Sequence, residues 1–115
     1  MQARNHHCEA LKLSQELGDL RGEANSYLAL ATLEETERNL DSAIQYLRSA
    51  LEKLEQAGSK ARTKSVLLDL GILLKRAGNM REAEFELRKA LIVQESINKN
   101  DIEFINKIKK ELNSL

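Results

Sequence analysis

Apolar residues recur along this chain every three or four positions, which is the period of an amphipathic α-helix. The pattern stops at five places, each with a stop signal followed by a plausible first cap of the next helix. These breaks lie at Gly18-Asp19, around Arg38-Asn39, at Gly58-Ser59, at Gly78-Asn79 and near Asn98–Asp101. The chain of 115 residues contains no proline, so the pattern predicts an all-α protein of about six helices without strands.

The apolar pattern also repeats at an offset of 40 residues. Segments 24–60 and 64–100 align without a gap and share ten identities in 37 positions, where about two are expected from average residue usage. The shared residues include Leu28/Leu68, Leu30/Leu70, Ala43/Ala83, Leu47/Leu87, Ala50/Ala90 and Leu51/Leu91. An internal repeat of this length predicts a solenoid of stacked units.

Each repeat carries a small residue in each of its two helices and a short turn between them. The small residues are Ala31, Ala43, Ala50, Gly71, Ala83 and Ala90, and the turns lie around Arg38-Asn39 and Gly78-Asn79. Small residues let two antiparallel helices approach closely while leucines fill the space beside them. Each repeat is therefore predicted to form a helical hairpin.

The second repeat resembles the tetratricopeptide-repeat family most closely. The resemblance is carried by Leu67, Leu70, Gly71, Leu74, Gly78, Ala83, Leu87 and Ala90. The first repeat departs from it with Glu34 and Arg38 in the places of Leu74 and Gly78. Glu55 and Glu95 replace the family's usual proline, so the second helices should run on. The longer period resembles the subclass of kinesin light chain and of Leu-Gly-Asn-repeat arrays, whose asparagine ladder is absent here.

The resemblance implies a single domain over 1–115, a TPR-like α-solenoid of antiparallel helix hairpins. Segments 22–58 and 62–98 form the two repeats, and 2–17 is an orphan second helix of a preceding repeat. Its leucines are expected to lack a cover, which predicts fraying, self-association through residues 3–17, or excision from a longer array. Segment 101–115 is expected to be a capping helix. Ile102, Ile105, Ile108, Leu112 and Leu115 share one face of it, and Asn100 or Asp101 is its cap.

In this family the first helices line a concave side that binds peptides. The matching positions form the predicted peptide-binding face. They are Asn25, Leu28, Thr32, Glu35 and Thr36 in the first repeat, and Ser65, Leu68, Asp69, Ile72, Lys75 and Arg76 in the second. Charged and apolar residues alternate there, as in a surface that binds a segment of mixed character. The alternative is that these are packing and solvated positions of a passive spacer. The family's carboxylate clamp holds the C-terminal tail of a chaperone with a lysine and an asparagine one helical turn apart. Leu28 and Thr32 do not supply these side chains, which argues against a chaperone-tail ligand.

No residue pattern in the chain indicates catalysis, a cofactor or a metal. His6, His7 and Cys8 are adjacent in sequence, whereas ligands on one helix need a spacing of three or four. Acidic groups such as Glu34, Glu35 and Glu37 are interpreted as a solvated helix face. We therefore expect no catalytic residues, no cofactor and no metal site, and conclude that the protein is not an enzyme.

Composition excludes two further classes of partner. Eighteen basic and eighteen acidic side chains cancel, and no basic stripe rich in aromatic residues occurs, which argues against nucleic acid. No run of eighteen apolar residues occurs, which argues against a membrane partner. A single cysteine favours a reducing, cytoplasmic location.

The sequence thus predicts a protein- or peptide-binding scaffold. Two alternatives remain open. One is a homo-oligomerisation module that forms a homodimer through the N-terminal helix, and the other is a regulatory sensor segment of a larger signalling protein.

Overall fold

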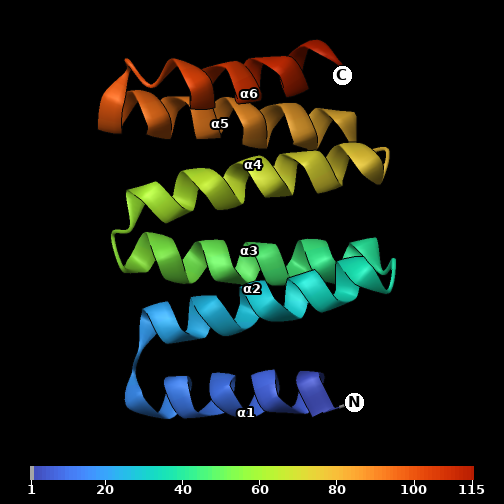
Figure 1. Ribbon diagram of the computed structural model, residues 1–115, viewed down its shortest axis with the longest axis vertical. Helices are drawn as coiled ribbons and strands as arrows, with labels where there is room; N and C mark the ends of the chain where they lie inside the picture. Colours follow the sequence, from blue (N-terminus) through green and yellow to red (C-terminus); the bar gives the residue numbers. More distant parts are fainter. Residues whose placement is uncertain (1) are drawn as a thin grey trace. The chain divides into compact units, whose positions relative to one another are not determined.

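The computed structural model describes residues 2–115, in which helices are joined by short turns (Figure 1). Each predicted break falls between two helices, and no strand occurs in the described residues. The helices are α1 (Gln2–Leu17), α2 (Leu20–Thr36), α3 (Leu40–Gln56), α4 (Lys60–Arg76), α5 (Met80–Asn98) and α6 (Ile102–Asn113). The all-α prediction and the positions of the helices are therefore confirmed.

Left-handed residues end four of the helices. Gly18, Gly58 and Gly78 have φ between 68° and 84°, and Arg38 adopts the same conformation with φ 65°. At Arg38 the Asn39 N–H donates to the Glu34 carbonyl at 2.8 Å and the Arg38 N–H to the Glu35 carbonyl at 3.0 Å. This pair of bonds satisfies carbonyls that the helix leaves without partners. Arg38 thus makes the turn that glycine makes in the second repeat.

The chain divides into two compact units, the first ending at Gly58 and the second spanning Ser59–Leu115. In the first unit α1 packs on α2, and α2 forms an antiparallel hairpin with α3 (Figure 1). Side chains on the facing sides of these helices are buried, among them Ala24, Leu30, Ala31, Ala43, Leu47, Ala50, Leu51 and Leu54. The small residues predicted for close helix contact lie in this core.

The second unit contains the hairpin of α4 and α5, with α6 packed on α5. Its core includes Leu67, Leu70, Leu74, Ala83, Leu87, Ala90, Ile105 and Ile108. At Gly71 α5 leaves no room for a side chain on α4, because a Cβ there would lie 2.6 Å from Leu87 Cγ. A methyl group at this position would require Leu87 to move.

The C-terminal helix α6 buries less than its apolar pattern predicts. In α6, Ile105 and Ile108 are buried, whereas Ile102 is 61% exposed and Leu115 is 39% exposed. The expected five-residue apolar face therefore covers the core only at its centre, since Ile102 lies in the first turn and Leu115 beyond the last. Asp101 is the cap, and its Oδ1 accepts the Phe104 N–H at 3.2 Å.

Candidate functional site

The predicted face of α2 lies on the side of that helix turned away from α1. Asn25, Thr32 and Thr36 are exposed, and Leu28 and Glu35 are half-buried. The Thr32 hydroxyl donates to the Leu28 carbonyl at 3.0 Å, and the Thr36 hydroxyl donates to the Thr32 carbonyl at 2.9 Å. The hydroxyl group of each threonine has therefore used its hydrogen and can only accept a hydrogen bond from a partner.

The predicted face of α4 carries a stronger mixture of apolar and charged groups. Leu68 and Ile72 are half-buried, while Ser65, Asp69 and Arg76 are exposed. The spacing of three and four residues places them along one side of the helix. Apolar side chains beside charges of both signs can take an apolar side chain of a peptide and pair with its charges.

Lys75, the remaining predicted residue of this face, is held by α6. Its Nζ donates to Glu111 Oε1 at 3.0 Å and to the Ser114 hydroxyl. Its side chain is 24% exposed. A partner that used Lys75 would have to displace Glu111, so the structure ties this residue to α6.

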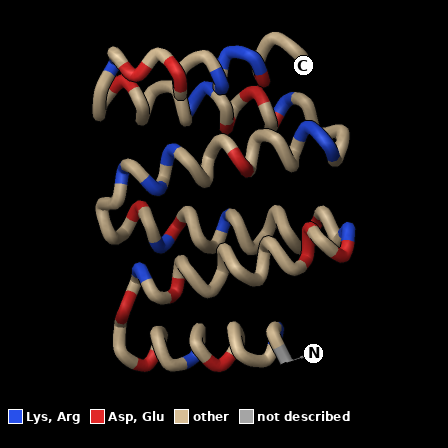
Figure 2. Tube along the Cα trace, in the orientation of Figure 1, with Lys and Arg blue, Asp and Glu red and all other residues tan. Residues whose placement is uncertain are grey.

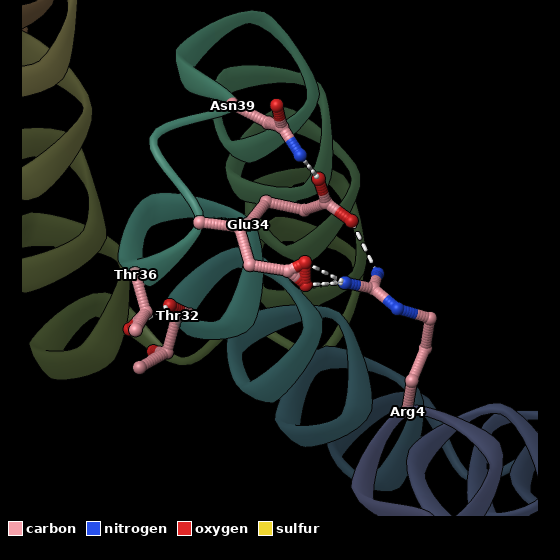
Figure 3. Close-up of polar contacts among 6 residues, drawn as sticks. Arg4, Thr32, Glu34, Thr36 and Asn39 are labelled. Carbon is pink, nitrogen blue, oxygen red and sulfur yellow. Dashed lines mark hydrogen bonds and ion pairs between the residues drawn. The ribbon is translucent and has the colours of Figure 1, made fainter. Parts of the chain in front are cut away.

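A partly buried ionic cluster joins α1 to α2 in the first unit. Glu34 accepts hydrogen bonds from Arg4 and from Asn39 Nδ2, the latter at 3.0 Å, and Arg4 also donates to Glu37 Oε2 at 3.0 Å. The Asn39 bond, followed by the Arg4 bond, lowers the pKa of Glu34 below its ordinary value. The bonds to Glu34 and Glu37 raise the pKa of Arg4. In Figure 3 Thr32 and Thr36 point away from this cluster, which therefore lies outside the predicted face.

This cluster corrects the interpretation of Glu34 as part of a solvated acidic face. Glu34 is buried, with a side chain that is 10% exposed. Its position in the repeat is the sequence signal that indicates burial, because Glu34 matches the buried Leu74 of the second unit. Its partner Arg4 lies 30 residues away, which is why local spacing did not reveal the pair.

A second cluster is centred on Lys64 and joins α4, α5 and α6. Lys64 Nζ lies 4.0 Å from the centroid of the Phe104 ring and 3.8 Å from Asp101 Oδ2, and it donates to Gln94 Oε1. Gln94 is 1% exposed, and its Nε2 donates to the Asn98 carbonyl at 2.7 Å. These contacts attach the start of α6 to the hairpin, so Lys64 has a structural role.

The first unit also contains a small open cavity of about 200 Å³ on α3. Ser42, Gln45, Tyr46 and Ser49 line it, and the Tyr46 ring lies 6.2 Å from the ring of Tyr27. Pockets for small molecules are usually 300–1,000 Å³. This cavity has room for one side chain of a partner.

The residues weighed for chemistry lie on α1. Cys8 is an exposed free cysteine, and the rings of His6 and His7 meet edge to face at 5.7 Å. Among the described residues no group of three or more His, Cys, Asp or Glu side chains is placed to hold a metal ion. Over the same residues, no helix combines the length and the apolar character that crossing a membrane requires.

No protein-family model matches the chain, and no curated protein is significantly similar to it.

Proposed function

We propose that this chain is a protein- or peptide-binding module of the tetratricopeptide-repeat type that performs no catalysis. The observation that carries the proposal is the face of α4, where half-buried Leu68 and Ile72 lie beside exposed Asp69 and Arg76. Partly exposed apolar side chains beside charged ones are typical of surfaces that recognise a peptide segment. The helical hairpins of each unit and the 40-residue repeat support the family assignment.

The chemistry of this face defines its ligand. Leu68 and Ile72 would contact one apolar side chain, while Asp69 and Arg76 would pair with a basic and an acidic group of the same segment. The ligand is accordingly a segment with an aliphatic or aromatic residue and charges of both signs. In the first unit Leu28 would offer a weaker apolar contact, flanked by Asn25 and Thr32.

A peptide-display selection against the intact chain tests the proposal. Selected peptides are titrated into the wild type and into the variant Asp69→Lys/Arg76→Glu, which exchanges one charge of each sign. Lys75 is left unchanged because it holds α6. We expect the dissociation constant to rise at least ~10-fold, as for loss of a central contact.

The matched control is Glu103→Lys/Lys109→Glu on exposed positions of α6. This variant makes the same exchange of charge away from the proposed face and should bind like the wild type. Equal binding by all three proteins would show that the face of α4 is not the site. A selection that returns no binding peptide would favour the passive-spacer interpretation.

Self-association is the second candidate function, because α1 exposes large apolar side chains. Leu13 is 56% exposed and Leu17 is 72% exposed, and the two are four residues apart on one helix face. Covering them would remove apolar area from water. Light scattering of the wild type and of Leu13→Gln/Leu17→Gln tests it, since only the wild type should gain mass with concentration.

A further inference from the structure

The outward face of α1 carries acids as well as leucines. Glu9, Leu13, Glu16 and Leu17 are all exposed, and their spacing places them within one face of the helix. We refer to these four residues as the acidic stripe. The half-buried Leu11 and Ser14 lie on other sides of α1, so the stripe is separate from the contacts that hold α1 in its unit.

A second exposed stripe follows α5 with the opposite charge. Arg81, Phe85, Arg88 and Ile92 are all exposed, with Phe85 at 65% and Ile92 at 67%. We refer to them as the basic stripe. Arg88 Nε donates to Glu84 Oε2 at 3.1 Å within α5, and both side chains are more than half exposed. An exposed pair of this kind contributes little, so Arg88 can exchange Glu84 for another acid at small cost.

The two stripes match in spacing as well as in charge. Glu9, Leu13 and Glu16 follow one another at intervals of four and three residues, and so do Arg81, Phe85 and Arg88. Helices packed along these faces would place Leu13 on Phe85 and an acid on each arginine. The intervals coincide when the two helices run parallel; in the antiparallel orientation the order acid, apolar, acid is kept, but the intervals differ by one residue.

The two units also differ in net charge, through charges that lie mostly outside α1 and α5. Residues 1–58 contain six basic and ten acidic side chains, a net charge of −4, whereas residues 59–115 contain twelve basic and eight acidic ones, a net charge of +4. In Figure 2 Lys and Arg predominate along α4, whereas α5 carries both signs. Opposite potentials on two surfaces favour their encounter.

We propose that a second copy of this chain is the partner of α1, and that the acidic stripe of one copy packs on the basic stripe of the other. The inference rests on the second candidate function, self-association, and names the surface that receives α1. It differs from a dimer in which two α1 helices meet, because like charges would then face each other across the contact. The interface is small, with two large apolar side chains on each side, and belongs to the weak, transient class.

Sedimentation velocity of the intact chain from about 10 μM to 1 mM tests the proposal. We expect the wild type to associate as its concentration rises. Arg81→Glu/Arg88→Glu and, separately, Glu9→Arg/Glu16→Arg should each raise the dissociation constant at least ~10-fold, because like charges then face each other. An equimolar mixture of these two variants should regain association, since each changed stripe meets a complementary one.

Controls separate the stripes from bulk charge and from misfolding. Lys109→Glu/Lys110→Glu on α6 and Glu52→Arg/Glu55→Arg on α3 make the same changes of net charge at exposed positions and should associate like the wild type. Phe85→Ser tests the basic stripe without charge reversal at a site where the core is untouched. Circular dichroism confirms equal helicity.

Three results would overturn the inference. If the controls weaken association as much as the stripe variants, only bulk charge acts. If Arg81→Glu/Arg88→Glu and Phe85→Ser associate like the wild type while Glu9→Arg/Glu16→Arg does not, self-association stands and α5 is not its receiving surface. A wild type that keeps the mass of one 13.0 kDa chain at every concentration rejects self-association itself, and leaves the peptide-binding proposal unaffected.

Discussion

Arg38 occupies a backbone conformation that favours glycine. Its φ of 65° corresponds to 84° at Gly78, the matching residue of the second repeat. A residue with a side chain is destabilised by about 1–2 kcal/mol in the left-handed region. Glycine removes this strain, but part of the gain is offset because glycine gives the unfolded chain more conformational freedom. Arg38→Gly should therefore raise the free energy of unfolding by about 1 kcal/mol, measured by urea denaturation at unchanged slope.

The reciprocal control for this prediction is Gly78→Ala. It places a methyl group in the left-handed turn and should lower the free energy of unfolding by a similar amount. No atom lies within 4 Å of a Cβ at Gly78, so backbone conformation alone sets the effect. A stabilising Gly78→Ala would show that the turns tolerate side chains equally.

Glu34 should make stability depend on acid pH. Its pKa in the folded chain lies below the ordinary value of 4.5, chiefly through the Asn39 hydrogen bond and next through Arg4. A lowered folded-state pKa stabilises the fold above pH 4.5, and this contribution is lost as the pH falls through the folded-state pKa. Glu34→Gln should accordingly lose less stability than the wild type between pH 6 and pH 3.

A carboxyl ¹³C titration by NMR checks the cause directly. The Glu34 carboxyl should titrate below 4.5, and Asn39→Ala should raise its pKa toward that value. A Glu34 carboxyl that titrates identically in both proteins would exclude the Asn39 bond as the cause.

At the scale of the helices, local sequence was sufficient to place every boundary. Glycine or asparagine signals and a 3.6-residue period depend on neighbours in the chain, which explains why α1 to α6 were found. Burial of polar residues was not predictable in the same way. Glu34 and Gln94 are buried because Arg4 and Lys64 reach them from other helices, 30 residues away in each case.

The same limit applies to the candidate site. The positions on α2 and α4 lie along one side of their helices, as their spacing requires. Lys75 differs because its partners Glu111 and Ser114 belong to α6, 36 and 39 residues later. Only the packing of α6 reveals that this lysine is already engaged.

The attachment of α6 is expected to depend on Lys64. Lys64→Met keeps an aliphatic stem against Phe104 but removes the ammonium over its ring and leaves Gln94 Oε1 without this donor. We expect the free energy of unfolding to fall by about 1–2 kcal/mol. Amide hydrogen exchange should also accelerate in α6 more than in α4, because α6 is the element that these contacts attach.

The control is Lys60→Met, which removes an exposed ammonium from the first turn of the same helix. It should leave exchange in α6 unchanged. If Lys64→Met also leaves α6 as protected as in the wild type, the apolar contacts of Ile105 and Ile108 suffice to hold this helix.

At the scale of the whole molecule, each compact unit has its own hairpin core. Leu47 and Leu87 occupy matching positions in the two repeats and are 5% and 0% exposed. Replacing such a leucine by alanine costs about 2–5 kcal/mol through lost burial and the cavity that remains. In a repeat protein, stability is a sum of unit and neighbour contributions, so the loss should act first where the cavity lies.

Leu87→Ala is therefore expected to accelerate amide exchange in α4 to α6 while α1 to α3 stay more protected, and Leu47→Ala should do the reverse. The matched pair removes the same atoms from equivalent sites, so a difference between the variants reports location alone. Exchange followed by NMR at each amide measures it. Equal acceleration throughout both units in either variant would mean that the chain opens as one cooperative body, and that the two hairpins derive their stability from each other rather than from their own cores.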